Sequence, residues 1–566
     1  MTGQNAKTAS PEPHRAMTRQ PTHRTAYGVC LLFWATWLLL VAHVPAAVGA
    51  GPSRATATVY GGAGRVSGSM TVLDTGNGRW MIDCGVFYPE GDEAGPERER
   101  RAAERSATLP VEPAAIDAVV ITHAHLDHFG RVPLLVDRGF RGPIYLARPT
   151  AELAGPMLEM QVRFDRARRR TWTWSKVSLE RARASGRSLY VHWRPCPYRG
   201  KIAAENRQTA ACSAGELAER FAGQEPPVRT YLCPSCSKEE VAAIRRQFRP
   251  LDYGRPREIA PGVVVTLLGA GHIPGSASVL FEISLPGGRR RVLFSGDLGS
   301  ELSALFAGPR PAPEADVVFL EATYGTTRRD AKVAGERAAF RQAVGEAVGS
   351  GGIAWVPAFA LDRTQKVFYE LHLAQQEGRL SRDVPIYCPS PSARAITEIY
   401  REHRRAGWFR EEVAADARAW QPGEVRKTVP RQLPRPSILV SPNDMATAEW
   451  SERLMESLLP EASTWVLLVG YQDALSEGGK LKQGARQLEV AGRRVHVRAR
   501  VRSFDCFSGH GDAADLDRWL AGVRRDARIV LVHGGREELR ARAAELNAAG
   551  RKAVVAVAGE GMELGQ

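Results

Sequence analysis

The chain has 566 residues, of which 44% are hydrophobic, enough apolar material for two cores. Its formal net charge is +15, and a basic protein of this kind can attract polyanions. Only 10 of the 77 basic residues are lysine, so the arginine bias can also reflect genome composition. Beyond the N-terminal segment, no stretch is long and apolar enough to span a bilayer.

The first 50 residues have the layout of an export signal. Three arginines precede an apolar run from Val29 to Ala42, and a proline and small residues follow up to Ala50. This order predicts a secretory signal peptide that is cleaved after Ala50. An uncleaved membrane anchor is one alternative, since the apolar run approaches spanning length, and a cytoplasmic protein whose start codon is assigned too early is another.

A histidine-rich segment follows the apolar run from Ala118 to Ile121, which we predict to be a buried strand. Side chains alternate along a strand, so His123 and His125 point the same way and can share one metal ion. Asp127 and His128 follow where the chain turns, near the start of a helix, and are placed to hold a second ion. Imidazole and carboxylate together are the ligand set that suits zinc.

This segment matches an HxHxDH signature and so resembles the metallo-β-lactamase superfamily. The resemblance continues in chain order over residues 56–566. Asp83 ends a strand in a segment similar to the family's first motif, where the acid is expected to brace the ligand loop. His272 and Asp297 follow strands in segments similar to the third and fourth motifs, and Asp297 is expected to bridge two metal ions.

A four-cysteine insertion lies at about 186–236, where the family would normally run through a short helical connection. Cys233-Pro-Ser-Cys236 is a zinc-knuckle-like turn, but the partner cysteines Cys196 and Cys212 are irregularly spaced. Three explanations stay open: one structural zinc ion, two disulfides in an exported protein, and unpaired structural thiols.

The second half of the chain resembles the β-CASP branch of this superfamily, whose members process nucleic acids. Glu321 lies in a segment similar to the acidic motif that opens the β-CASP insertion, and residues 355–365 and 470–472 resemble core segments of that insertion. His510 and His533 lie in two motifs similar to those that close the domain. Five or six motifs in the family's order make this a strong resemblance.

The fold class implied is α/β, an αββα metallo-β-lactamase sandwich with an inserted α/β β-CASP domain. Apolar strand runs that alternate with helical stretches such as residues 335–348 also argue for α/β. We expect the first part of the sandwich at 56–324, the β-CASP domain at 325–500 and the return segment at 501–566. Within the insertion, two segments depart from the family's usual patterns, which puts substrate handling in doubt more than metal chemistry. They are residues 441–445 and 476–480.

The resemblance also implies a ligand set for two zinc ions that share Asp297. A water between the ions would attack phosphorus, with Asp127 helping to steer it. His510 would protonate the leaving oxygen, and Glu321 would orient His510. The first ion would be held by His123, His125, His272 and Asp297, and the second by Asp127, His128, Asp297 and His533.

The function implied is a zinc-dependent phosphodiesterase that hydrolyses RNA, with DNA as a competing substrate. A hydrolase of a small ester, lactone or phosphoester is the alternative, although such enzymes lack the β-CASP motifs. A non-catalytic nucleic-acid-binding subunit is a third, and the filled ligand positions argue against it. The sequence leaves the oligomeric state open, a homodimer included.

Overall fold

The computed structural model describes residues 55–76, 78–89, 96–173, 234–442, 449–490 and 492–564. The expected signal or anchor at 1–50 lies outside these ranges, and so do Cys196, Cys212, Cys233 and the side chain of Cys236. Those expectations stay predictions. Within the described ranges, no helix is both long and apolar enough to cross a bilayer.

The first sheet has seven strands. In spatial order they are β22 (Gly561–Glu563), β1 (Thr56–Gly61), β2 (Met70–Asp74), β3 (Arg79–Ile82), β4 (Ala118–Ile121), β5 (Ile144–Ala147) and β6 (Phe248–Leu251). β3 to β6 run parallel to one another. β4, the strand expected before the histidine-rich segment, is buried at every position. Its continuous apolar run fits a parallel strand that is covered on both faces.

The second sheet also has seven strands. In spatial order they are β21 (Lys552–Val555), β20 (Arg528–Val532), β11 (Val317–Glu321), β10 (Gly288–Phe294), β9 (Ala277–Leu285), β8 (Val263–Gly269) and β7 (Arg257–Ala260). β10, β11 and β20 are parallel neighbours. β9 is antiparallel to both β8 and β10, so β8 runs in the same direction as β10. The carboxyl ends of β8, β10, β11 and β20 therefore share one edge of the sheet.

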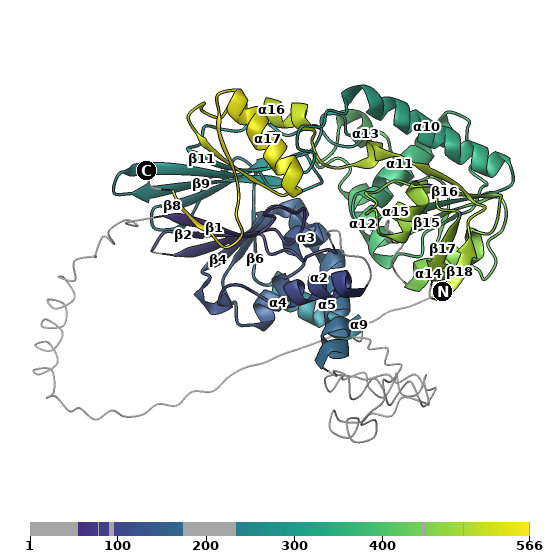
Figure 1. The fold of residues 1–566 in the computed structure, drawn as a ribbon, viewed down its shortest axis with the longest axis horizontal. Helices are drawn as coiled ribbons and strands as arrows, with labels where there is room; N and C mark the ends of the chain where they lie inside the picture. Colours follow the sequence, from purple (N-terminus) through teal and green to yellow (C-terminus); the bar gives the residue numbers. More distant parts are fainter. Residues whose placement is uncertain are drawn as a thin grey trace, which may run out of the picture. The chain divides into compact units, whose positions relative to one another are not determined.

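Helices cover the outer faces of these two sheets. They are α2 (Pro96–Ala107), α3 (Leu126–Phe129), α4 (Val132–Asp137), α5 (Arg148–Thr173), α9 (Pro234–Arg245), α16 (Ala513–Leu520) and α17 (Arg536–Ala548), with a 3-10 turn at Pro113–Ala115. The inner faces pack on each other, since Val120 and Phe281 belong to one buried cluster. Leu158 of α5 packs under the first sheet, and Trp519 of α16 packs over the second. Figure 1 shows α4 and α5 on one side of the two sheets and α16 and α17 on the other. These four layers confirm the αββα sandwich.

The inserted segment builds a third sheet, parallel throughout. Its strands in spatial order are β14 (Val425–Arg426), β13 (Ile386–Tyr387), β15 (Ser437–Ser441), β12 (Ile353–Pro357), β16 (Thr464–Leu468) and β19 (Arg500–Ser503). β19 completes this sheet by pairing with β16.

Helices and one hairpin complete the inserted domain (Figure 1). The helices are α10 (Asp330–Gly349), α11 (Arg363–Gln376), α12 (Pro391–Glu402), α13 (Glu411–Ala415), α14 (Glu449–Leu458) and α15 (Glu477–Lys482), with a 3-10 turn at Asp505–Phe507. The hairpin is β17 (Gln487–Val490) with β18 (Arg493–His496). An α/β domain inserted into an αββα sandwich is the expected fold class, which is thereby confirmed.

Side-chain contacts join the inserted domain to the sandwich. Arg98 of α2 donates two hydrogen bonds to the carboxylate of Asp473, one of them at 2.6 Å. Ala124, which lies between His123 and His125, packs in the same buried cluster as Ala358 and Leu361 after β12. One buried cluster therefore extends from the histidine-rich segment into the inserted domain.

Candidate metal centre

The candidate ligands converge where the parallel strands of both sheets end. His123 follows β4, Asp297 follows β10 and His533 follows β20, each within a few residues of the last strand residue. His272 follows β8 after a short turn. Binding sites in parallel α/β sheets form at the carboxyl ends of the strands, because the loops there bring residues from distant parts of the chain together.

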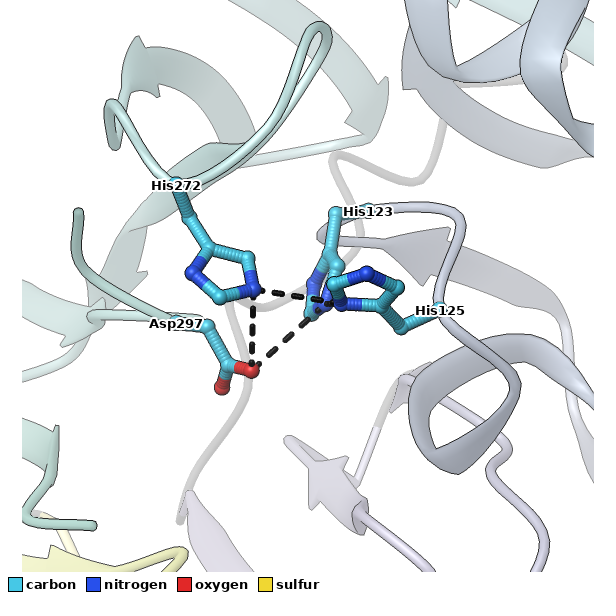
Figure 2. A group of neighbouring side chains, drawn as sticks. All are labelled: His123, His125, His272 and Asp297. Carbon is cyan, nitrogen blue, oxygen red and sulfur yellow. Dashed lines mark hydrogen bonds and ion pairs between the residues drawn. The ribbon is translucent and has the colours of Figure 1, made fainter. Parts of the chain in front are cut away.

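The first cluster consists of three imidazoles and one carboxylate (Figure 2). His125 Nδ1 lies 3.1 Å from both His123 Nε2 and His272 Nε2. Asp297 Oδ2 lies 3.5 Å from His123 Nε2 and 3.8 Å from His272 Nε2. Four donor atoms at such separations can surround one ion, and three nitrogens with one oxygen suit zinc.

The second cluster lies on the other side of Asp297. His128 Nε2 is 3.1 Å from His533 Nε2 and 3.2 Å from Asp297 Oδ1. Asp127 Oδ2 is 3.5 Å from His533 Nε2 and 4.0 Å from His128 Nε2. The two oxygens of one carboxylate thus face two different sets of donors.

Asp297 itself fits a group that bridges two metal ions. The residue is 2% exposed, and its Oδ1 is buried without a well-aligned hydrogen-bond donor. A buried oxygen without a partner is rare in proteins and calls for an unseen partner such as an ion. The donor set and this oxygen together fit a dinuclear metal site.

Asp83 fixes the loop after β4, which carries the ligand histidines. Its Oδ1 accepts a hydrogen bond from the Thr122 N–H at 2.8 Å, and its Oδ2 accepts one from the Thr122 hydroxyl at 2.8 Å. The same Oδ2 lies 2.7 Å from His128 Nδ1. A carboxylate on the second ring nitrogen fixes the tautomer and directs Nε2 towards the metal position.

Glu321 holds His510 at the end of β11. Its Oε1 accepts a hydrogen bond from the Leu298 N–H at 2.9 Å and lies 3.2 Å from His510 Nδ1. Its Oε2 accepts hydrogen bonds from the N–H and the hydroxyl of Thr323, at 3.1 and 2.7 Å. The same hydroxyl lies 3.3 Å from His510 Nδ1 and 3.0 Å from His533 Nδ1, so one threonine connects the carboxylate to both histidines.

His510 is more accessible than His533 and His272. Its side chain is 19% exposed, against 4% for His533 and 2% for His272. Its Nδ1 lies 3.8 Å from Asp297 Oδ2, and His510 also forms a metal-sized group of donors with Asp297 and His533. The geometry thus places His510 where it can either reach a substrate or approach an ion.

Burial controls the protonation of the first cluster. It lowers the pKa of His123 and His272 well below the ordinary value, and it lowers the pKa of His125 to about 4. Desolvation disfavours the charged imidazolium, so all three rings are neutral near pH 7. The neutral ring is the form that binds metal.

Nearby carboxylates control the protonation of the histidines in the second cluster. Burial lowers the pKa of His128, but the nearby Asp297 and Asp83 outweigh burial and raise that pKa well above its ordinary value. Burial likewise lowers the pKa of His533, and Asp297 and Asp127 raise it overall. Metal binding at this cluster must therefore displace protons.

Backbone strain is concentrated at this centre. Within the described part of the chain, three non-glycine residues have a positive φ, namely Asp83 at 61°, Asp362 at 72° and His533 at 51°. Such a backbone conformation is unfavourable for these side chains and persists where the surrounding structure enforces it, often at functional sites. Two of the three are predicted site residues.

Two threonines that contact these side chains, Thr122 and Thr323, were not predicted from the sequence, and neither was the nearby ion pair of Asp362 and Lys366. Thr122 lies directly beside His123, and Thr323 lies two residues after Glu321. This closeness in sequence is the signal that could have identified them. Asp362 and Lys366 lie around the start of α11, and their position near the centre follows only from the folded structure.

Three family models match the chain. The model described as the metallo-beta-lactamase superfamily matches residues 63–345, which is half of the chain. The chain belongs to the metallo-beta-lactamase superfamily. The Beta-Casp domain model matches residues 364–481, and the model described as the Zn-dependent metallo-hydrolase RNA specificity domain matches residues 494–557. The resemblance to the β-CASP branch is thereby confirmed, and membership of the superfamily implies a dinuclear metal site.

Several curated proteins are similar over most of the chain. Ribonuclease TTHA0252 of Thermus thermophilus is 28% identical over 89% of this chain and 98% of its own length. The RNase J-like protein of Methanocaldococcus jannaschii is 23% identical over 84% of this chain and 92% of its own. Transcription termination factor FttA of the same organism is 27% identical over 84% of this chain and 66% of its own length.

Proposed function

We propose that this protein is a zinc-dependent ribonuclease that hydrolyses phosphodiester bonds in RNA. The observation that carries the proposal is Asp297, whose two oxygens face two separate clusters of donors beside the Glu321–His510 pair. The matches to the Beta-Casp and RNA specificity domains support a nucleic acid as substrate, and the names of two relatives, a ribonuclease and an RNase J-like protein, support RNA.

The ligands proposed are those that the two clusters bring together. Zinc ions held there would supply Lewis acidity for the phosphoryl oxygens and an activated water for attack on phosphorus. The imidazole and carboxylate donors favour zinc over magnesium or calcium, which prefer oxygen ligands alone. The first ion would be bound by His123, His125, His272 and Asp297, and the second by Asp127, His128, Asp297 and His533.

His510 is the proposed general acid. Glu321 faces its Nδ1, which fixes the ring and leaves Nε2 to give a proton to the leaving oxygen of the scissile bond. Thr323 keeps Glu321 in place through the two hydrogen bonds to Oε2. Asp127 is the more exposed carboxylate, with its side chain 16% accessible against 1% for Asp297, and is placed to orient the attacking water.

A panel of substrates tests this proposal. Zinc-loaded protein should cleave labelled RNA in preference to DNA of the same sequence and should turn over no small ester or lactone. His510→Ala should retain its zinc, measured by mass spectrometry of the metal, and lose about two to four orders of magnitude in rate. Zinc loss in proportion to activity would make His510 a ligand, and turnover of small esters without RNA cleavage would favour the alternative hydrolase.

We also propose that the N-terminal 50 residues are either a cleaved signal peptide or a membrane anchor. Mass spectrometry of the native protein should find an N-terminus at or near Gly51 if the signal is cleaved, and a membrane-bound intact chain if it is an anchor. An intact chain in a soluble cytoplasmic fraction would contradict both.

A further inference from the structure

A buried lysine lies in the inserted domain close to the proposed general acid. Lys366 of α11 is 4% exposed, and its Nζ is 2.6 Å from Asp362 Oδ2. Lysine is almost never fully buried unless a partner compensates its charge. The metal centre and the proton transfer described above make no use of this pair.

Lys366 reaches out of its own domain to the loop that carries His510. Its Nζ donates to the carbonyl oxygens of Phe507 and Ser508, at 3.4 Å each. An ammonium has three hydrogens, and Asp362 with these two carbonyls accounts for all of them. The only residue between Ser508 and His510 is Gly509, so Lys366 holds the backbone immediately before the general acid.

Two further contacts restrain the loop that carries His510. A Cβ on Gly509 would lie 2.6 Å from His272 Cε1, so the backbone already touches a predicted metal ligand. Arg329 donates from Nη2 to the His510 carbonyl at 2.5 Å and stacks over the Tyr324 ring at 4.1 Å. The loop is thus fixed between the metal centre and two cations, of which Lys366 is the buried one.

The backbone of Asp362 has an unfavourable conformation. Its φ of 72° lies in the left-handed region, where glycine would sit without strain, and its Oδ1 is buried without a hydrogen-bond partner. A carboxylate is therefore held at this point although the backbone favours glycine.

We propose that Asp362 and Lys366 form a positioning pair, through which the inserted domain fixes the position of the His510 side chain. Asp362 neutralises and orients Lys366, and Lys366 fixes the Phe507 and Ser508 carbonyls so that the His510 ring stays against Glu321. The inference rests on the proposed role of His510 as general acid. Lys366 touches neither the substrate nor a metal ligand in this scheme, and it acts only through the loop.

Substrates with different leaving groups distinguish a misplaced His510 from a general disruption of the active site. A ribose oxygen is a poor leaving group and needs a proton from His510, whereas 4-nitrophenolate departs without one. Loss of the positioning pair should therefore slow RNA cleavage and spare the hydrolysis of bis(4-nitrophenyl) phosphate. His510→Ala should show the same selectivity and serves as the reference.

The variant of choice is the double substitution Asp362→Asn with Lys366→Met. It removes both charges together, so no unpaired charge is left in the interior, and asparagine tolerates a positive φ. We expect kcat on RNA to fall about 10–100-fold, the range typical of lost supporting contacts, with zinc content and bis(4-nitrophenyl) phosphate turnover unchanged. Asp362→Gly with Lys366→Met is the second variant. It also removes both charges and in addition relieves the strained backbone, so it should fold where the first variant does not, and we expect the same selectivity from it.

A matched control comes from an exposed lysine that has the same spacing from its carboxylate partner. Lys332 lies 3.5 Å from Glu336, four residues along α10, and its side chain is 77% exposed, so Lys332→Met should leave both activities unchanged. Equal losses on RNA and on bis(4-nitrophenyl) phosphate in the pair variants, or no loss on RNA, would overturn the positioning role. If His510→Ala itself lacks the selectivity, the general-acid proposal fails, and the inference fails with it.

Discussion

Asp297 is the residue on which both clusters depend. We expect Asp297→Ala to lower bound zinc from two ions towards one or none and to abolish hydrolysis, because it removes the only donor shared by the two sets. Metal analysis of the purified variant checks this directly. His533→Ala is the comparison, since it removes a donor from the second cluster alone and should weaken only one ion. Full metal occupancy and full activity in Asp297→Ala would rule out the bridging position.

Individual site residues are predictable from the sequence where the signal is local. His123, His125 and His128 lie within six residues of one another, so their spacing alone indicates a metal site. Thr323 is not predictable as a link, because its contact with His533 joins residues 210 positions apart. Lys366 escapes prediction for the same reason, since its partners Phe507 and Ser508 lie 141 and 142 positions away.

Among the elements, α2 and the loop after β16 are joined by one ion pair. The Arg98 side chain is 8% exposed and that of Asp473 is 17% exposed. Burial tends to raise the pKa of Asp473, but its hydrogen bonds with Arg98 lower that pKa overall. The pair therefore stabilises the protein at pH values above the pKa of an unfolded aspartate, and this contribution is lost as the pH falls through the depressed pKa of the folded state.

We accordingly expect Asp473→Asn to lower the free energy of unfolding by about 1.5–3 kcal/mol at neutral pH, as for other hydrogen bonds to charged groups. Denaturant unfolding at a series of pH values measures this effect. The difference between the variant and the parent protein should shrink in acid, where the parent carboxyl also becomes neutral. A difference that stays constant from neutral to acid pH would show that charge pairing is not the cause. Asp526→Asn, on an exposed aspartate paired with Arg524, is the control.

Strands with continuous apolar runs are predictable as elements. The runs that become β12, β15, β16 and β20 read as buried strands, and such runs are what parallel sheets with both faces covered require. The two-residue strands β13 and β14 and the hairpin of β17 and β18 give no such signal. β17 alternates exposed with buried positions over only four residues, and β18 buries Val495 alone, so neither pattern is long enough to recognise.

At the scale of the whole molecule, the four cysteines of the insertion decide the total metal content. We predict one structural zinc ion there, in addition to the two proposed at the catalytic centre, so total zinc should be near three per chain. Cys233→Ser should remove about one ion and lower stability while leaving the catalytic ions in place. Peptide mapping without reduction that found Cys196, Cys212, Cys233 and Cys236 in disulfides would contradict this prediction.

The net charge of +15 predicts how the whole protein meets its substrate. If single-stranded RNA lies along basic surface, each neutralised phosphate releases counterions, and the logarithm of affinity should fall with the logarithm of salt concentration by about 0.7 per contact. Bis(4-nitrophenyl) phosphate carries one charge and should show almost no such slope, so the same preparation provides the control. The measurement is KM for labelled RNA from low to moderate salt, with zinc content followed in parallel. RNA cleavage that ignores ionic strength would mean that the positive charge of this chain serves something other than RNA binding.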